Sequence, residues 1–211
     1  MAAGSTTDAV AQLYRARAEP AFVEVPPLTY LSRDGHGDPN TSAAYATTVQ
    51  ALYAVSYAAK FAVKRSTGED VKVSPLEGLW WSDDMSAFTA AAKDRWDWTM
   101  MIRQPASVTA DLVAELAEKV ARTKGLPAAR DLRLAVVDEG TAAQVLHVGP
   151  YAAEGPTIAR LHDFIHEHGF TFEVDGQGLR HHEIYLGDPR RAAPEKLRTI
   201  IRQPCRRQGG G

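Results

Sequence analysis

The chain has 211 residues, of which 45% are hydrophobic and 24% charged, and its formal net charge is −2. These values are typical of a globular protein with a substantial core, and the charge balance gives no electrostatic footprint for nucleic acid. The single cysteine, Cys205, excludes an intramolecular disulfide and a multi-cysteine metal site. Because no apolar run reaches membrane-span length and no secretory leader is evident, we expect a cytoplasmic protein without membrane or nucleic-acid partners.

Hydrophobic spacing and chain breakers predict two halves that repeat one order of elements. The first half is predicted to form a strand, a long helix and two strands, at Phe22–Tyr30, Ser42–Lys64, Asp70–Trp81 and Trp96–Arg103. A connecting helix is predicted over Thr109–Lys124, with Thr109 as its N-cap and Gly125 as its stop. The second half is predicted to have extended segments at Leu132–Val137 and Gln144–Val148 and a helix at Pro156–His168. Two strands follow, at Leu179–Leu186 and Leu197–Arg202.

A short repeat supports a degenerate duplication of the chain. Ile102–Arg103–Gln104–Pro105 recurs as Ile201–Arg202–Gln203–Pro204, after elements that fall in the same order. The predicted fold class is α+β, with two strand–helix–strand–strand modules related by a pseudo-twofold axis and a ligand groove between them. We expect one domain over 1–211, which divides into a first module at 15–105, a connecting helix at 106–130, a second module at 131–204 and a flexible tail at 205–211.

The most informative segment is the predicted strand that carries Glu183. Strand periodicity places two sets of side chains on opposite faces, with His181, Glu183 and Tyr185 on one and His182, Ile184 and Leu186 on the other. Ile184 and Leu186 belong in a core. Glu183 then lies in mid-strand without a Lys or Arg nearby in the sequence. A carboxylate is rarely found in the middle of a sheet without a partner. Glu183 faces either water or something that needs a base or a negative charge.

Aromatic residues of the first half offer material for a pocket. The predicted long helix carries an aromatic stripe that includes Tyr53 and Tyr57, and two adjacent tryptophans, Trp80 and Trp81, point to opposite faces of a strand. Core packing is the ordinary explanation for such residues. The alternative is that one or two of these rings, with Trp81 or Trp98 favoured, line a flat slot for a planar ligand. Tyr53, Tyr57, Trp80 and His181 are further substrate-binding candidates.

Other chemistry has weaker support in the sequence. His162 and His166 have the spacing of two helical metal ligands, but no His-Glu-x-x-His pattern is present, so we expect neither a metal nor a cofactor. The cations beside Cys205 could lower its pKa, although no base partner for a nucleophile can be identified. Glu77 could be a second acid of the pocket, but a surface or turn role beside Gly78 is favoured.

Several segments together resemble the GyrI-like small-molecule-binding family. They are Val148–Gly149–Pro150–Tyr151, Glu154 with the helix through Phe164, Glu183–Pro189, Pro194–Leu197 and Ile201–Pro204. The resemblance covers about residues 15–204. It implies two modules of the SHS2 type with a ligand groove between them, near a buried glutamate that by motif position is Glu183.

The resemblance also implies a choice of functions. Barely twenty residues precede the first predicted strand, too few for the helix-turn-helix domain of a regulator, and the double tryptophan is similar to the stand-alone branch that hydrolyses cyclopropanoid genotoxins. In such a hydrolase Glu183 would be the base, Tyr185 or Tyr57 a donor to the carbonyl, and Trp81 and Trp98 stacking surfaces for a planar aromatic substrate. The alternative is binding or sequestration of lipophilic aromatic cations without turnover. Inhibition of a topoisomerase has no feature in the sequence that supports it.

Overall fold

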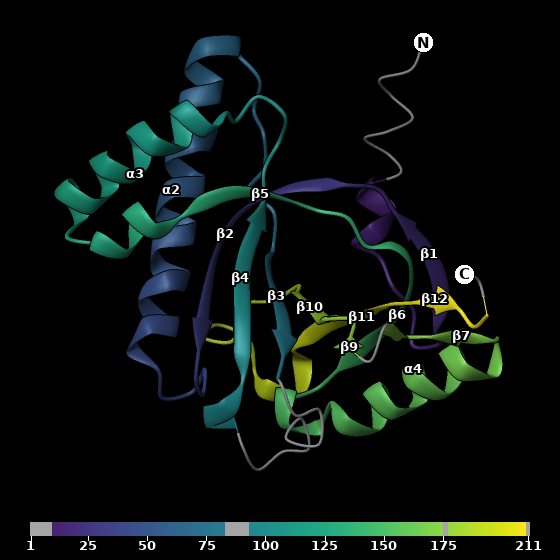
Figure 1. Ribbon diagram of the computed structural model, residues 1–211. Coiled ribbons are helices and arrows are strands. Elements are labelled where there is room, and N and C mark those ends of the chain that lie inside the picture. The colour runs from purple at the N-terminus through teal and green to yellow at the C-terminus, as the bar shows by residue number, and fades with distance from the viewer. Residues whose placement is uncertain (1–9, 83–92, 175–176, 210–211) are drawn as a thin grey trace, which may run out of the picture. The chain divides into compact units, whose positions relative to one another are not determined.

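The structure is a computed structural model that describes residues 10–82, 93–174 and 177–209 (Figure 1). The chain divides into two compact units. Unit 1 joins Met1–Pro27 to Asp138–Gly211, and unit 2 is Leu28–Val137. Helices and antiparallel strands are mixed in both, which confirms the predicted α+β class.

Unit 2 is built around four antiparallel strands in the order β3-β4-β2-β5. Its elements in chain order are β2 (Leu28–His36), α2 (Ala43–Thr67), β3 (Leu76–Trp81), η2 (Lys93–Arg95), β4 (Asp97–Arg103), α3 (Ala110–Lys124), η3 (Pro127–Asp131) and β5 (Arg133–Val137). In Figure 1, α2 and α3 lie side by side, and α2 packs against β2 and β4.

Local capping explains where the two helices of unit 2 begin and end. The Ser42 hydroxyl accepts a hydrogen bond from the Tyr45 amide at the start of α2, and Gly68 ends the helix with a φ of 77°. At α3, Thr109 caps the first turn and Gly125, with a φ of 63°, follows the last turn. Both predictions for the connecting helix are therefore confirmed.

A glycine across the strand ladder makes room for the largest buried side chain of unit 2. Gly35 of β2 pairs with Trp98 of β4, and a Cβ at Gly35 would overlap the six-membered ring of Trp98. The Trp98 indole nitrogen also donates a hydrogen bond of 3.2 Å to the Gly37 carbonyl. The ring is thus held flat over the backbone of β2.

We expect Gly35→Ala to destabilise the protein because either the indole or the strand must move. Overpacking of this kind costs about 1–3 kcal/mol of unfolding free energy, which chemical denaturation followed by tryptophan fluorescence would measure. The control is Gly187→Ala, because open space surrounds Gly187. Equal effects of the two substitutions would contradict the assigned packing of Trp98 on Gly35.

Unit 1 pairs four antiparallel strands in the order β1-β6-β11-β10. Its elements in chain order are β1 (Ala21–Val25), β6 (Gly140–Val148), η4 (Tyr151–Ala153), α4 (Gly155–Glu167), β7 (Phe170–Thr171), β8 (Glu173–Val174), β9 (Gln177–Gly178), β10 (His181–Tyr185), η5 (Pro194–Lys196), β11 (Arg198–Pro204) and β12 (Arg206–Arg207). The helix α4 covers β6 and β11, and its Leu161 and Ile165 pack into a core with Val145 and Ile201.

The end of the chain differs from the predicted flexible tail. Cys205 is buried in the core beneath α4, and its amide donates to the Thr141 carbonyl over 3.0 Å. Arg206 and Arg207 form β12, which pairs with β7. Residues 205–207 are therefore part of the packed structure, because Cys205 lies in the core and β12 pairs with β7. Residues 210–211 of the predicted tail lie outside the described residues.

The predicted order of elements recurs in the two units, with corrections to individual strands. The segment predicted for the second half at Leu132–Val137 instead contains β5, which pairs with β2 in unit 2. The orders β2-α2-β3-β4 and β6-α4-β10-β11 match, and β4 and β11 carry the repeated Ile-Arg-Gln-Pro segments. The predicted strand Phe22–Tyr30 is instead two strands, because Pro26 and Pro27 cannot donate to a ladder. It follows that β1 pairs in unit 1 and β2 in unit 2. Likewise β3 begins at Leu76, directly after Pro75, and not at Asp70.

Among the residues that the structure describes, none of the helices has the length and apolar character needed to cross a membrane.

Candidate functional site

The strand β10 distributes its side chains as strand periodicity predicts. Glu183 pairs with Ile201 of β11, and Ile201 lies in the core beneath α4. Directly paired residues of antiparallel strands point to the same face, so Glu183 lies on the α4 side together with His181 and Tyr185. His182 and Ile184 are completely buried on the opposite face.

The α4 side of β10 brings a carboxylate, an imidazole and two phenols together. Oε1 of Glu183 lies 3.3 Å from Nε2 of His181, and the two side chains are 14% and 4% exposed, respectively. The ring of Tyr185 meets the ring of Tyr151 edge-on, with their centroids 5.6 Å apart. A partly exposed carboxylate of this kind can accept a proton from water, and a phenol nearby can donate to a developing oxyanion.

A second histidine reaches this face from α4. Burial, followed by the charges of His181 and His166, lowers the pKa of His162 to about 4. The His162 ring packs on Phe172 with centroids 4.3 Å apart. His162 is therefore neutral at neutral pH. The sequence analysis considered His162 as a possible metal ligand together with His166.

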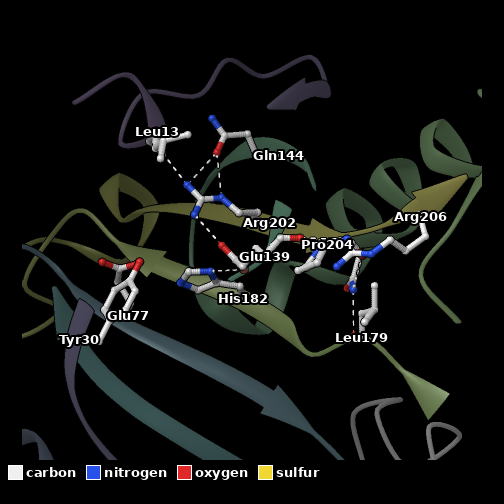
Figure 2. Close-up of polar contacts among 11 residues, drawn as sticks. Leu13, Tyr30, Glu77, Glu139, Gln144, Leu179, His182, Arg202, Pro204 and Arg206 are labelled. Atoms are coloured by element: carbon white, nitrogen blue, oxygen red, sulfur yellow. Dashed lines mark hydrogen bonds and ion pairs between the residues drawn. The ribbon is translucent and has the colours of Figure 1, made fainter. Parts of the chain in front are cut away.

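The opposite face of β10 holds a buried ionic cluster that the sequence analysis missed (Figure 2). Nδ1 of His182 lies 2.9 Å from one carboxylate oxygen of Glu139, and Nη1 of Arg202 donates to the other over 3.1 Å. The Arg202 guanidinium also donates to Gln144 over 3.1 Å and 3.2 Å and to the Leu13 carbonyl over 2.8 Å. The cluster ties β10, β11, β6 and the N-terminal segment together.

The charges of this cluster favour the ionised form of Glu139. Burial opposes ionisation, but His182 and Arg202 outweigh it and lower the pKa of the Glu139 carboxyl to about 2, from an ordinary value of 4.5. A carboxyl whose pKa is depressed on folding contributes stability above its unfolded pKa. That contribution is lost as the pH falls through the folded pKa.

We therefore expect Glu139 to contribute to acid unfolding between about pH 4.5 and pH 2. As the pH falls through this window, the unfolding free energy of Glu139→Gln should decline less steeply than that of the wild type. Urea titrations at a series of pH values measure this difference. Glu118→Gln is the control, since the exposed Glu118–Arg130 pair at 2.8 Å is screened by solvent. Identical slopes for the wild type and Glu139→Gln would contradict the assigned role of the cluster.

In unit 2, two of the four tryptophans of the chain belong to the core. Trp98 is fully buried. Trp80, also buried, stacks on Tyr45 with centroids 6.1 Å apart and meets Trp96 edge-on at 5.7 Å. The prediction that Trp98 stacks on a ligand does not fit this burial, because no part of its ring is accessible. The ordinary explanation, core packing, holds for Trp98.

The remaining aromatic candidates of unit 2 keep accessible surface. Trp81 packs partly buried against the cluster of Tyr30, Leu79 and Met101. The rings of Tyr53 and Tyr57 on α2 stack with centroids 6.5 Å apart, and Tyr57 is 50% exposed. Their role in ligand binding stays a prediction.

Glu77 is buried, although a surface or turn role was favoured from the sequence. Its exposed fraction is 0%, and the Tyr30 hydroxyl donates to its carboxylate over 3.3 Å (Figure 2). The reason for the difference is the register of β3, in which Glu77 pairs with Met101 of the apolar cluster. Glu77 is thus a buried carboxylate of unit 2.

Comparison with known proteins identifies the family. The chain matches the GyrI-like small molecule binding domain over residues 18–205. It belongs to the GyrI-like family. A small-molecule ligand is therefore the expected partner of this GyrI-like chain.

Solved structures agree with this identification. A hydrolase from Listeria innocua is 33% identical to the GyrI-like chain, with a TM-score of 0.81, over 95% of this chain and 98% of that one. An uncharacterized conserved protein from Listeria innocua is 35% identical, with a TM-score of 0.82, over 93% and 96%. The C-terminal domain of EcmrR is 13% identical, with a TM-score of 0.53 over 90% and 98%, and shares the fold alone. No curated protein matches the chain.

Other features of the GyrI-like chain do not compete with β10 as a site. Burial raises the pKa of the Cys205 thiol to about 11, against the prediction that nearby cations lower it. No group of three potential metal ligands occurs within the described parts of the chain. A surface depression of about 450 Å³ in unit 2 includes Arg33 and Asp131, but these neutralise each other at 2.9 Å.

Proposed function

We propose that this GyrI-like protein binds a planar aromatic small molecule and hydrolyses a strained cyclopropane ring of that molecule by adding water. The observation that carries the proposal is the Glu183 carboxylate, which stays partly accessible on β10 beside His181 and the Tyr151–Tyr185 pair. The Listeria innocua hydrolase at 33% identity supports a hydrolytic reaction. Opening and detoxifying a cyclopropanoid genotoxin is the physiological role that we propose.

The proposed reaction needs a base and an oxyanion donor but no redox step. Glu183 accepts a proton from water, and the water oxygen forms a bond to a ring carbon of the cyclopropane. The carbon–carbon bond that breaks sends its electron pair into a conjugated dienone, which becomes a phenolate. Tyr185 is proposed to donate a hydrogen bond to the oxygen where this charge develops. Protonation of the phenolate completes the addition of one water.

A time course with a spirocyclopropyl-dienone compound tests the proposal. Loss of the dienone absorbance, with a product that has gained one water by mass spectrometry, is the expected result for the wild-type protein. The reaction without protein sets the background. Unchanged compound after prolonged incubation with folded protein would refute the hydrolase assignment.

A second candidate function is the sequestration of lipophilic aromatic cations without turnover. The specific observation that favours it is the same carboxylate beside aromatic rings, because negative charge and ring faces both attract such cations. Calorimetric titration with a lipophilic aromatic cation separates the two functions. Under sequestration, Glu183→Gln weakens binding of the cation, and no compound is consumed.

A further inference from the structure

The pair formed by His181 and Glu183 is asymmetric in its exposure. The imidazole is 4% exposed and the carboxylate is 14% exposed. In a pair of a histidine and a carboxylate, either member can be the base that contacts the substrate. The other member then orients that base. Because the carboxylate is the more accessible member here, the imidazole lies on the inner side of the pair.

The strand fixes the geometry of this pair. His181 and Glu183 are two residues apart on β10 and therefore point to the same face. Glu183 is held in register by Ile201, and the adjacent His182–Arg202 pair continues the ladder. On the same side, the Gln203 amide donates to the Leu179 carbonyl over 2.9 Å and secures the segment before His181. The 3.3 Å contact is thus built on paired backbone and not on a loop.

The helix α4 places an uncharged histidine near His181. His162 is the histidine of α4 that lies near His181, and it is neutral at neutral pH because burial lowers its pKa to about 4. The His162 ring is packed on Phe172. The histidine of α4 near the pair is therefore a neutral ring that packs on Phe172.

We propose that His181 is a positioning residue for Glu183, whose imidazole holds the carboxylate so that the carboxylate and not the imidazole meets the substrate. The pair itself rests on the geometry of His181 and Glu183. The effect of the pair on turnover rests on the proposed function. This inference replaces the prediction that His181 contacts the substrate, since the side chain of His181 is almost fully buried. The exposed His36–Asp97 pair, at 2.8 Å in unit 2, offers a matched control.

Two substitutions of His181 separate positioning from simple packing. His181→Gln keeps a polar nitrogen near the place of Nε2, whereas His181→Phe keeps the volume and removes the polar nitrogen. We expect His181→Phe to lower kcat about ten- to hundredfold with little change in KM, and His181→Gln to retain most of the activity. The control His36→Asn should have wild-type kinetics. Wild-type kcat in His181→Phe, or equal losses in both His181 variants, would overturn the inference.

A spectroscopic measurement tests the pair independently of turnover. The ring nitrogen shifts of His181, observed by NMR in the wild type and in Glu183→Gln, should differ because the partner of Nε2 has changed. Those of His36 should not. If the wild type shows no turnover, the proposed function fails while this measurement still decides whether the pair exists. Unchanged His181 shifts would overturn the inference even where turnover is present.

Discussion

Glu183→Gln should reduce kcat/KM for a spirocyclopropyl-dienone substrate by about 10²- to 10⁴-fold, the contribution that a general base usually makes. The amide keeps the size of the side chain but cannot accept a proton from water. Binding of the neutral substrate should persist, because the substitution leaves the neighbouring Tyr151–Tyr185 pair unchanged. Steady-state kinetics and an equilibrium binding titration measure the two effects separately.

Glu195→Gln is the matched control for this prediction. Glu195 is exposed in η5, and the same chemical change there should leave kinetics and binding at wild-type values. If Glu183→Gln turned over the substrate at the wild-type rate, Glu183 would not be the base. If it lost binding of the neutral substrate instead, the role of Glu183 would be to form the pocket.

Arg202→Met should destabilise the protein by about 3–5 kcal/mol, because removal of one partner from a buried ion cluster leaves an uncompensated charge. Arg202 is almost completely buried, and its guanidinium supplies the hydrogen bonds to Glu139, Gln144 and the Leu13 carbonyl (Figure 2). Chemical denaturation of the purified variant gives the change in unfolding free energy.

Arg198→Met provides the comparison within the same strand. Arg198 is exposed at the start of β11, where a substitution is expected to change the unfolding free energy by about 0.5 kcal/mol or less. A similar small effect at both positions would show that the cluster contributes little to stability. A large effect at Arg202 alone supports the cluster as the element that joins β10, β11 and β6.

The sequence predicted features that depend on local pattern. The alternation of His181–Tyr185 fixed which residues share a face, and the caps of α3 at Thr109 and Gly125 were readable because capping is a local interaction. The double proline at Pro26 and Pro27 was also visible, and its effect on the predicted strand could have been inferred from the missing backbone donors.

Features that depend on distant partners could not be read in the same way. Glu139 lies in a stretch that reads as a turn before Gly140, and its partners are 43 and 63 residues away. The burial of Trp98 follows from its pairing with Gly35, which the register of β2 and β4 alone determines. Glu77 reads as exposed beside Gly78, but the same kind of long-range register buries it near Tyr30.

A single-turnover reaction in water enriched with heavy oxygen tests the central claim most directly. With enzyme in excess over the spirocyclopropyl-dienone substrate, a base at Glu183 predicts heavy oxygen (¹⁸O) in the product of the first turnover. Glu183→Gln should form that product about 10²- to 10⁴-fold more slowly. First-turnover product that carries ordinary oxygen, together with heavy oxygen incorporated into Glu183, would instead identify a covalent intermediate and contradict the assignment of Glu183 as a base.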